Sequence, residues 1–219
     1  MACFNFTGSN YASISALSTN LLGGGGSFTV SCRVYPLSYD GTYRSPFGLY
    51  ASGTNNVGLS IPRDASAQVV RLIGSVNGAS ATENTTIAAT ASTWAIYTLV
   101  WDQSALQLKI YKNGVLGHTK QLLGGFESVA STPLYVGALA GGTYRYNSKT
   151  ADIRLYSAVV TPNHAVLATS ESNLVAWYPY PNAAGNARDA SGNGNHMTTT
   201  GGSLYSASGG PGLPWVTLP

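Results

Sequence analysis

The chain has 219 residues, of which only 9% are charged, and its formal net charge is +3 at pH 7. Its eleven Lys and Arg residues are scattered without a run, so the electrostatic footprint of a nucleic-acid-binding protein is missing and we expect no nucleic acid partner. No apolar stretch approaches the roughly 20 residues of a membrane span, and the N-terminus shows no signal peptide pattern. The low charge fits a displayed, neutral polar surface better than a crowded cytosolic enzyme.

The first third of the chain reads as short strands separated by Gly, Asn, Asp and Pro turn residues. The expected strands are residues 4–6, 11–14, 28–35, 47–51, 57–61 and 68–73. In the third of these, alternation places Cys32 on the core face with Val30 and Val34, whereas Cys3 alternates against Phe4 and is expected to point outward. A disulfide needs converging side chains, so we expect two free thiols.

The second half of the chain carries the strongest period-two pattern. Strands are expected at residues 94–101, 106–112, 115–116, 134–137 and 152–157. Asn113-Gly114 supplies the positive φ angles of a tight hairpin turn. A short helical turn follows, with Thr161 as N-cap, Pro162 in the first helical position, and residues 165–169 continuing it.

The order of these pieces, closed by Asp152-Ile153-Arg154-Leu155-Tyr156-Ser157, resembles the laminin G-like, concanavalin A-like jelly-roll family. The resemblance covers about residues 1–170 and implies an all-β, two-sheet antiparallel jelly-roll sandwich with one short helical turn. It also implies a domain that is used mostly for binding.

The C-terminal segment is similar to the stretch that often opens a domain of this family. It either completes the same sandwich or begins another repeat. Leu174, Ala176 and Tyr178 alternate with their neighbours and could pair at a sheet edge, which favours the first alternative. We therefore interpret residues 1–219 as a single domain in which 173–219 form an edge strand and a tail. The tail carries Trp215, an aromatic anchor that could contact a neighbouring subunit.

Catalytic chemistry has little support in the sequence. The eight acidic residues are dispersed, whereas glycosidases of the resembled fold carry closely alternating acids on one strand. His118, His164 and His196 are isolated, and we expect each at the surface or in a turn. We expect no enzyme; a glycoside hydrolase or lyase is a distant alternative.

A Gly-rich loop offers oxygen atoms to a hard cation. Asp189, Asn193 and Asn195 are the candidate ligands of a calcium site, and no other cofactor is expected. Because Asp and Asn also stabilise turns through their own backbone, a turn role is the favoured alternative.

Two loops combine aromatic rings with hydrogen-bonding side chains and are expected to be exposed. The candidate ligand-binding residues are Tyr39, Tyr43, Arg44, Tyr144, Arg145, Tyr146 and Asn147. Sugars present apolar C–H faces and hydroxyl edges, which rings with Arg or Asn could hold. Alternatively, the tyrosines cover strand ends or contact another subunit.

Two classes of function remain open. The first is a carbohydrate-binding or adhesion module that takes a glycan or cell-surface polysaccharide, with multivalency supplying avidity. The second is a structural subunit of an assembly, such as a capsid decoration, fibre or tail protein of a bacteriophage, in contact with other subunits or with copies of itself. Both interpretations place the chain on a virion surface or outside the cell.

Overall fold

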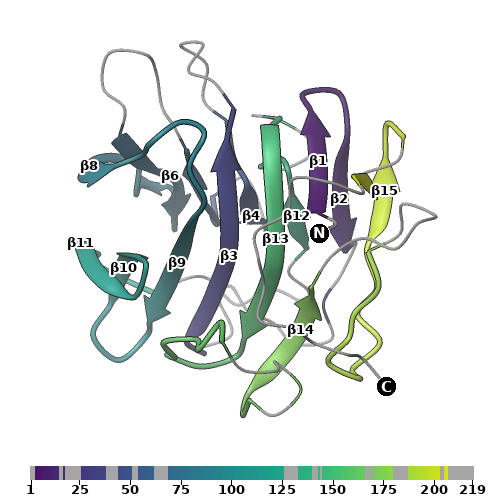
Figure 1. Ribbon diagram of the computed structural model, residues 1–219. Helices are drawn as coiled ribbons and strands as arrows, with labels where there is room; N and C mark the ends of the chain where they lie inside the picture. Colours follow the sequence, from purple (N-terminus) through teal and green to yellow (C-terminus); the bar gives the residue numbers. More distant parts are fainter. Residues whose placement is uncertain are drawn as a thin grey trace.

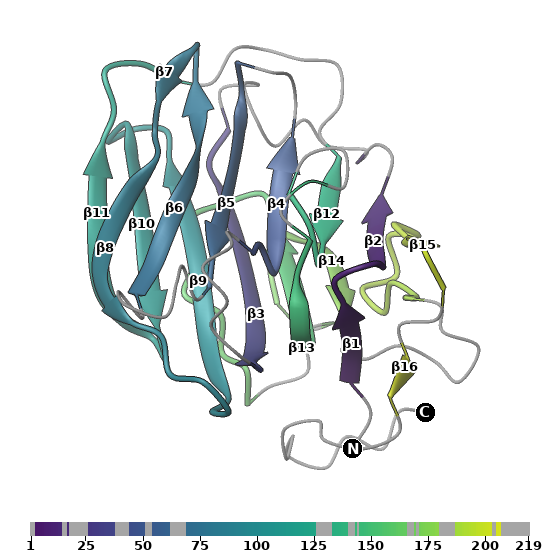
Figure 2. The same ribbon diagram turned by 90° about the horizontal axis from the view of Figure 1, so that it is seen from above.

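The computed structural model describes residues 3–14, 17, 26–37, 44–50, 54–61, 69–125, 133–139, 143, 145–165, 169, 171–179, 187–202 and 205–206. Within these ranges, sixteen strands form two eight-stranded sheets that lie face to face as two layers (Figures 1 and 2). All pairings between these strands are antiparallel. The all-β, two-sheet antiparallel sandwich predicted from the sequence is confirmed.

Sheet A has the order β11-β10-β9-β3-β13-β1-β16, and β14 also pairs with β13. Its strands are β1 (Cys3–Thr7), β3 (Phe28–Pro36), β9 (Ala95–Asp102), β10 (Gln107–Lys112), β11 (Val115–Gln121), β13 (Asn147–Tyr156), β14 (Leu174–Tyr178) and β16 (Tyr205–Ser206). Sheet B has the order β15-β2-β12-β4-β5-β6-β7, and β8 pairs with β6. Its strands are β2 (Tyr11–Ile14), β4 (Phe47–Tyr50), β5 (Asn56–Ser60), β6 (Val69–Val76), β7 (Ala79–Ser80), β8 (Glu83–Ala88), β12 (Leu134–Val136) and β15 (Thr198–Thr200).

The core lies between the sheets because alternate side chains of each strand point inward. In β3, Val30 is buried and pairs across the sheet with Leu99 of β9, which is buried too. Leu49 and Leu59 of sheet B belong to the same buried cluster. The residues between these inward positions form the outer faces of the two sheets.

Strand β13 joins the two ends of the chain to the sheet. Its first half pairs with β1, with Phe4 opposite Thr150, and its second half pairs with β14, with Ala176 opposite Leu155. The register shifts around Asp152, whose φ of 48° lies in the left-handed region and marks a β-bulge. Segments from both ends of the chain thus share one edge of β13 (Figure 1).

All the strands expected from the sequence are present, with shifted bounds, and Asn113 and Gly114 have the positive φ angles of the expected turn. Strands β7, β8, β15 and β16 were not predicted. Of the expected helical turn, residues 166–168 lie outside the described ranges, and Thr169 has a 3₁₀ conformation. The tail with Trp215 lies outside them as well.

The expectation that both thiols are free is confirmed, and Cys3 points away from the core as expected, but this position is covered. Cys3 lies on the face of β1 opposite Phe4, as alternation predicts, yet it is fully buried. Its strand is paired with β13 on one side and with β16 on the other, so it lies inside sheet A instead of at an open edge. Burial raises the pKa of the Cys3 and Cys32 thiols. None of the helical segments in the described ranges has the length and apolar character to cross a bilayer.

Candidate functional site

The two loops singled out by their aromatic residues meet at the end of the sandwich where β13 begins. Nη1 of Arg44 donates a hydrogen bond to the carbonyl oxygen of Arg145 at 3.0 Å. Arg145 is exposed, and Asn147 is the half-buried first residue of β13. Three of the seven candidate residues lie outside the described ranges: Tyr39, Tyr43 and Tyr144.

Tyr146 is buried, and the prediction that it is exposed is wrong. Only 1% of it is exposed, and its ring lies 6.4 Å from that of Phe6, centroid to centroid. Burial raises the pKa of the Tyr146 phenol. The physical reason is that Tyr146 continues the inward-facing series of Ser148 and Thr150, which pair with the core residues Phe6 and Phe4. Polar residues at these inward positions hid the pattern from sequence analysis.

In place of Tyr146, the structure brings the strand residue Tyr11 next to Arg145, and Tyr135 next to Tyr11. The guanidinium carbon of Arg145 lies 5.7 Å from the ring centroid of Tyr11, and the rings of Tyr11 and Tyr135 are 6.2 Å apart. Nη1 of Arg145 also donates to the carbonyl oxygen of Ser9 at 3.2 Å, which fixes the side chain over the ring. We call Tyr11, Tyr135 and Arg145 the Tyr–Arg patch.

The strand pattern explains the position of the two tyrosines. Ala12 and Ile14 of β2 are buried, and so are Leu134 and Val136 of β12, so the residues between them point to the outer face of sheet B. Tyr11 and Tyr135 are half-buried there and leave part of each ring to solvent. The same alternation in the sequence predicts both strands, but it does not contain the pairing that brings the two rings together.

The Tyr–Arg patch offers flat apolar rings beside a cation with several N–H donors. Rings can stack on the apolar face of a cyclic ligand, while the guanidinium and the phenol groups bond to its hydroxyl or carboxylate edges. The patch has the chemistry to bind a polar ring compound at a partly exposed surface.

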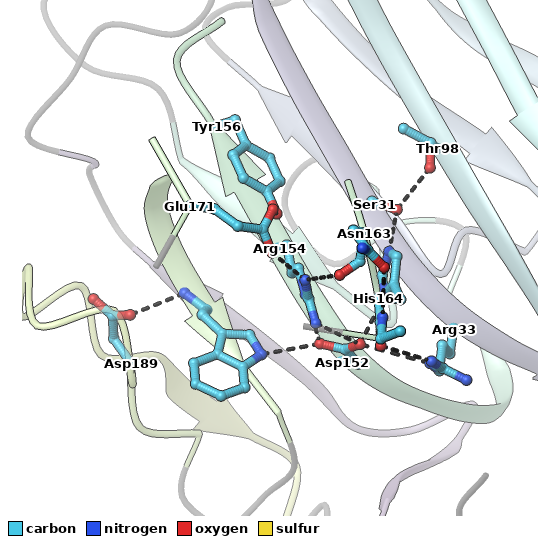
Figure 3. Close-up of polar contacts among 12 residues, drawn as sticks. Ser31, Arg33, Thr98, Asp152, Arg154, Tyr156, Asn163, His164, Glu171 and Asp189 are labelled. Carbon is cyan, nitrogen blue, oxygen red and sulfur yellow. Dashed lines mark hydrogen bonds and ion pairs between the residues drawn. The ribbon is translucent and has the colours of Figure 1, made fainter. Parts of the chain in front are cut away.

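A second polar constellation lies on the outer face of sheet A, where it connects Ser31, His164 and Asp152 (Figure 3). Nε2 of His164 is 2.8 Å from Oγ of Ser31, and Nδ1 of His164 is 2.7 Å from Oδ2 of Asp152. Asp152 also accepts bonds from Arg154 at 2.9 and 3.1 Å and from Nε1 of Trp177 at 2.9 Å. His164 lies in a turn, which is one of its two expected places, but it is only 6% exposed, so a place at the surface is wrong.

The surroundings of Asp152 and His164 determine the protonation state of each side chain. Burial alone would raise the pKa of Asp152, but the hydrogen bonds and charges of His164 and Arg154 hold that pKa well below its usual range. Burial lowers the pKa of His164 against the opposing pull of Asp152. The bonding pattern then assigns a neutral imidazole that donates from Nδ1 to Asp152 and accepts at Nε2 from Ser31.

Serine, histidine and aspartate in this order also form the catalytic triad of many hydrolases. Here Ser31 is fully buried in the middle of β3, and its Oγ is also bonded to Oγ1 of Thr98 at 2.6 Å. The arrangement holds Asn163, His164 and Glu171 against sheet A. Arg154 donates to the carbonyl oxygen of Asn163 at 2.9 Å and is paired with Glu171.

The three candidate calcium ligands are close together but are engaged with the backbone. The Asp189 carboxylate accepts from the N–H groups of Trp177 (2.9 Å), Ser191 (2.9 Å) and Asn195 (3.0 Å). The side-chain amides of Asn193 and Asn195 donate to the carbonyl oxygen of Val175 at 3.1 and 2.8 Å. These bonds are those of the turn role that the sequence favours, and a calcium site stays the less favoured alternative.

The other described carboxylates are paired with cations. Glu83 lies 2.6 Å from Nζ of Lys120, and Asp102 lies 2.8 Å from Nζ of Lys109. Across the described ranges, no group of three or more His, Cys, Asp or Glu residues could hold a metal ion.

Residues 6–166 match the concanavalin A-like lectin/glucanases superfamily, in its Laminin G branch. The match covers well over half of the chain, so the protein belongs to this family. The resemblance stated from the sequence is confirmed at this level. A comparison with curated proteins finds no match.

Solved structures with the same fold include proteins of several kinds. A candidate carbohydrate binding protein from Bacteroides ovatus has a TM-score of 0.69 at 19% identity over 91% of this chain; the chain spans 58% of that structure. A heptameric SAP-like pentraxin from Limulus polyphemus has a TM-score of 0.62 at 13% identity, with 93% and 94% of the two chains covered. The tailspike protein 2 of Escherichia coli O157:H7 bacteriophage CAB120 has a TM-score of 0.55 at 10% identity, over 74% of this chain and 25% of the tailspike. At these identities the likeness is one of fold.

Proposed function

We propose that this protein is a non-catalytic carbohydrate-binding module of a virion or another extracellular assembly. The observation that carries the proposal is the Tyr–Arg patch, in which Arg145 is held over Tyr11 and Tyr11 lies against Tyr135. Rings and a guanidinium at a partly exposed surface suit a sugar, which has an apolar face and a polar edge. The family includes lectins, and a similar structure is a candidate carbohydrate binding protein.

The arrangement of the acidic residues supports binding without turnover. Glycoside hydrolysis generally needs two carboxyl groups that face the sugar together. Among the described residues, Asp152 and Glu171 approach each other only through Arg154, and both are bonded to its guanidinium. The described strands of sheet B carry a single carboxylate, Glu83, and it is paired with Lys120.

A glycan array compares the wild-type protein with the double variant Tyr11→Ala/Tyr135→Ala. Both side chains are half-exposed, so we expect the fold to persist and binding to weaken about tenfold. Tyr111→Ala is the matched control, because Tyr111 is a half-exposed tyrosine of β10 in sheet A. Unchanged binding of the double variant, or a silent array with folded protein, contradicts the proposal.

A purely structural role as a subunit of an assembly is the second candidate. Leu123, Val115 and Leu116 are 102%, 70% and 50% exposed, and they lie in or just after β11, the edge strand of sheet A. Beside Leu123 is a pocket of about 420 Å³ between the β6–β7 hairpin and the end of β11. Exposed apolar side chains beside a hollow favour contact with another subunit.

Light scattering on a size-exclusion column distinguishes the two roles. A subunit that associates through β11 forms oligomers that dissociate in a Leu123→Ser variant. A monomer that binds glycans on the array supports the module alone. Stable oligomers together with a silent array support the structural role.

A further inference from the structure

A second aromatic and cationic cluster crosses the outer face of sheet A. Asn5 of β1, Lys149 of β13 and Tyr35 of β3 stand directly opposite one another in the strand register. The ring of Trp94, just before β9, lies 5.4 Å from that of Tyr35. Neighbouring strands are about 4.8 Å apart, so this Trp–Lys row is more than roughly 10 Å long.

Among the described residues, no hydrogen bond or ion pair engages the ammonium group of Lys149. Nζ of Lys149 lies 5.8 Å from the ring centroid of Tyr35 and pairs with no described carboxylate. The chain has three other lysines, all described: Lys109 is paired with Asp102, Lys120 with Glu83, and Lys112 donates to the carbonyl oxygen of Ala88 at 2.6 Å.

The exposure and the donor groups of the Trp–Lys row suit a ring-shaped ligand that carries a carboxylate. The side chains of Asn5, Tyr35, Trp94 and Lys149 are all half-buried, so each keeps a surface for contact. Indole N–H, phenol O–H and ammonium groups are donors, and the ammonium adds a full positive charge. An acceptor-rich ring with a carboxylate satisfies this set better than a neutral sugar does.

We propose that the Trp–Lys row is a second glycan site, separate from the Tyr–Arg patch, and that it binds the carboxylated sugars of an acidic polysaccharide. Trp94 and Tyr35 contact the sugar rings, and Lys149 binds the carboxylate. The proposal rests on the proposed function, because the ligand is a glycan. With sites on the outer faces of both sheets, one molecule can hold two points of a long chain and gain avidity.

The test is a titration with a galacturonate hexamer and with maltohexaose as the neutral counterpart. Calorimetry gives the affinity, and NMR follows the indole N–H of Trp94, assigned with a Trp94→Phe variant. We expect the hexamer of galacturonate to shift this signal and maltohexaose to leave it in place. Lys149→Gln should weaken galacturonate binding about five- to tenfold, whereas the control Lys112→Gln should not.

The outcomes separate this proposal from the function proposed above. If array binding depends on Tyr11 and Tyr135 while galacturonate leaves the Trp94 signal unmoved, the second site is refuted and the module stands. If galacturonate shifts Trp94 in the Tyr11→Ala/Tyr135→Ala variant, the second site is supported independently of the patch. Equal shifts with maltohexaose refute the acidic specificity, and the absence of any glycan binding refutes both proposals.

Discussion

Replacing Asp152 by Asn tests whether the Ser31–His164–Asp152 constellation holds the fold together. The Asp152 carboxylate accepts four bonds, two from Arg154 and one each from His164 and Trp177. Each of its oxygens faces two of these donors, so an amide NH₂ group meets two N–H groups whichever way it turns. Removing one partner of a buried ion pair costs about 3–5 kcal/mol, and we expect that loss in the free energy of unfolding.

Urea unfolding, followed by tryptophan fluorescence and far-UV circular dichroism, measures this loss. Asp102→Asn is the matched control, because Asp102 is also paired with a cation in sheet A, but its side chain is 15% exposed. We expect the control to lose no more than about 1 kcal/mol. If Asp152→Asn fails to fold, Trp177→Phe removes the indole donor together with part of a buried ring that lies against Arg154, and it should cost about 2–3 kcal/mol. An Asp152→Asn variant that is as stable as the control refutes the structural role.

Three further predictions concern other residues. The pKa of His164 is lowered in the folded protein, so on acidification the unfolded chain takes up a proton at this residue before the folded chain does. The contribution of His164 to the free energy of unfolding is therefore fully present above about pH 6.5. Below that pH the free energy of unfolding falls by up to about 1.4 kcal/mol per pH unit. Urea unfolding curves measured at intervals of one pH unit should show this slope in the wild type but not in His164→Gln. A wild-type free energy of unfolding that does not change between pH 7 and 5 would contradict the prediction. Tyr146→Ala should lower the free energy of unfolding by about 3–5 kcal/mol, while Tyr135→Ala stays within about 1 kcal/mol; equal losses would mean that Tyr146 is not a core residue. The oxygens of the Asp189 carboxylate already accept hydrogen bonds from backbone N–H groups, so we expect calorimetry to give the same melting temperature in calcium and in EDTA. A rise of several degrees in calcium would show that the loop binds the metal.

The fold could be predicted because its signals are local. Leu108 and Ile110 alternate with polar residues over a few positions, and Asn113-Gly114 marks the turn that follows. The Tyr–Arg patch was predictable in part. Arg145 was found from its loop, whereas Tyr11 and Tyr135 needed the register between β2 and β12, which a single sequence does not contain.

The buried constellation could not be predicted for the same reason. Ser31 and His164 are 133 residues apart in the sequence, and neither stands in a motif with a fixed spacing. The pairing of β3 with β13 places Ser31 opposite Arg154. The chain that follows β13 then folds back over the sheet, so that His164 contacts Ser31 and Asp152. Burial of three polar groups runs against hydrophobic patterning, so the pattern predicts a solvent-exposed residue in each case.

The shared edge of β13 limits how the protein can be shortened. A chain cut after residue 166, where the similarity to the family ends, would lose β14 and strip the partner from residues 153–156. Those residues would have unpaired backbone N–H and C=O groups beside exposed apolar side chains, and such an edge promotes strand pairing between molecules and aggregation. For any dissection of this protein, strand pairing is therefore a better guide to a safe boundary than the extent of the family match.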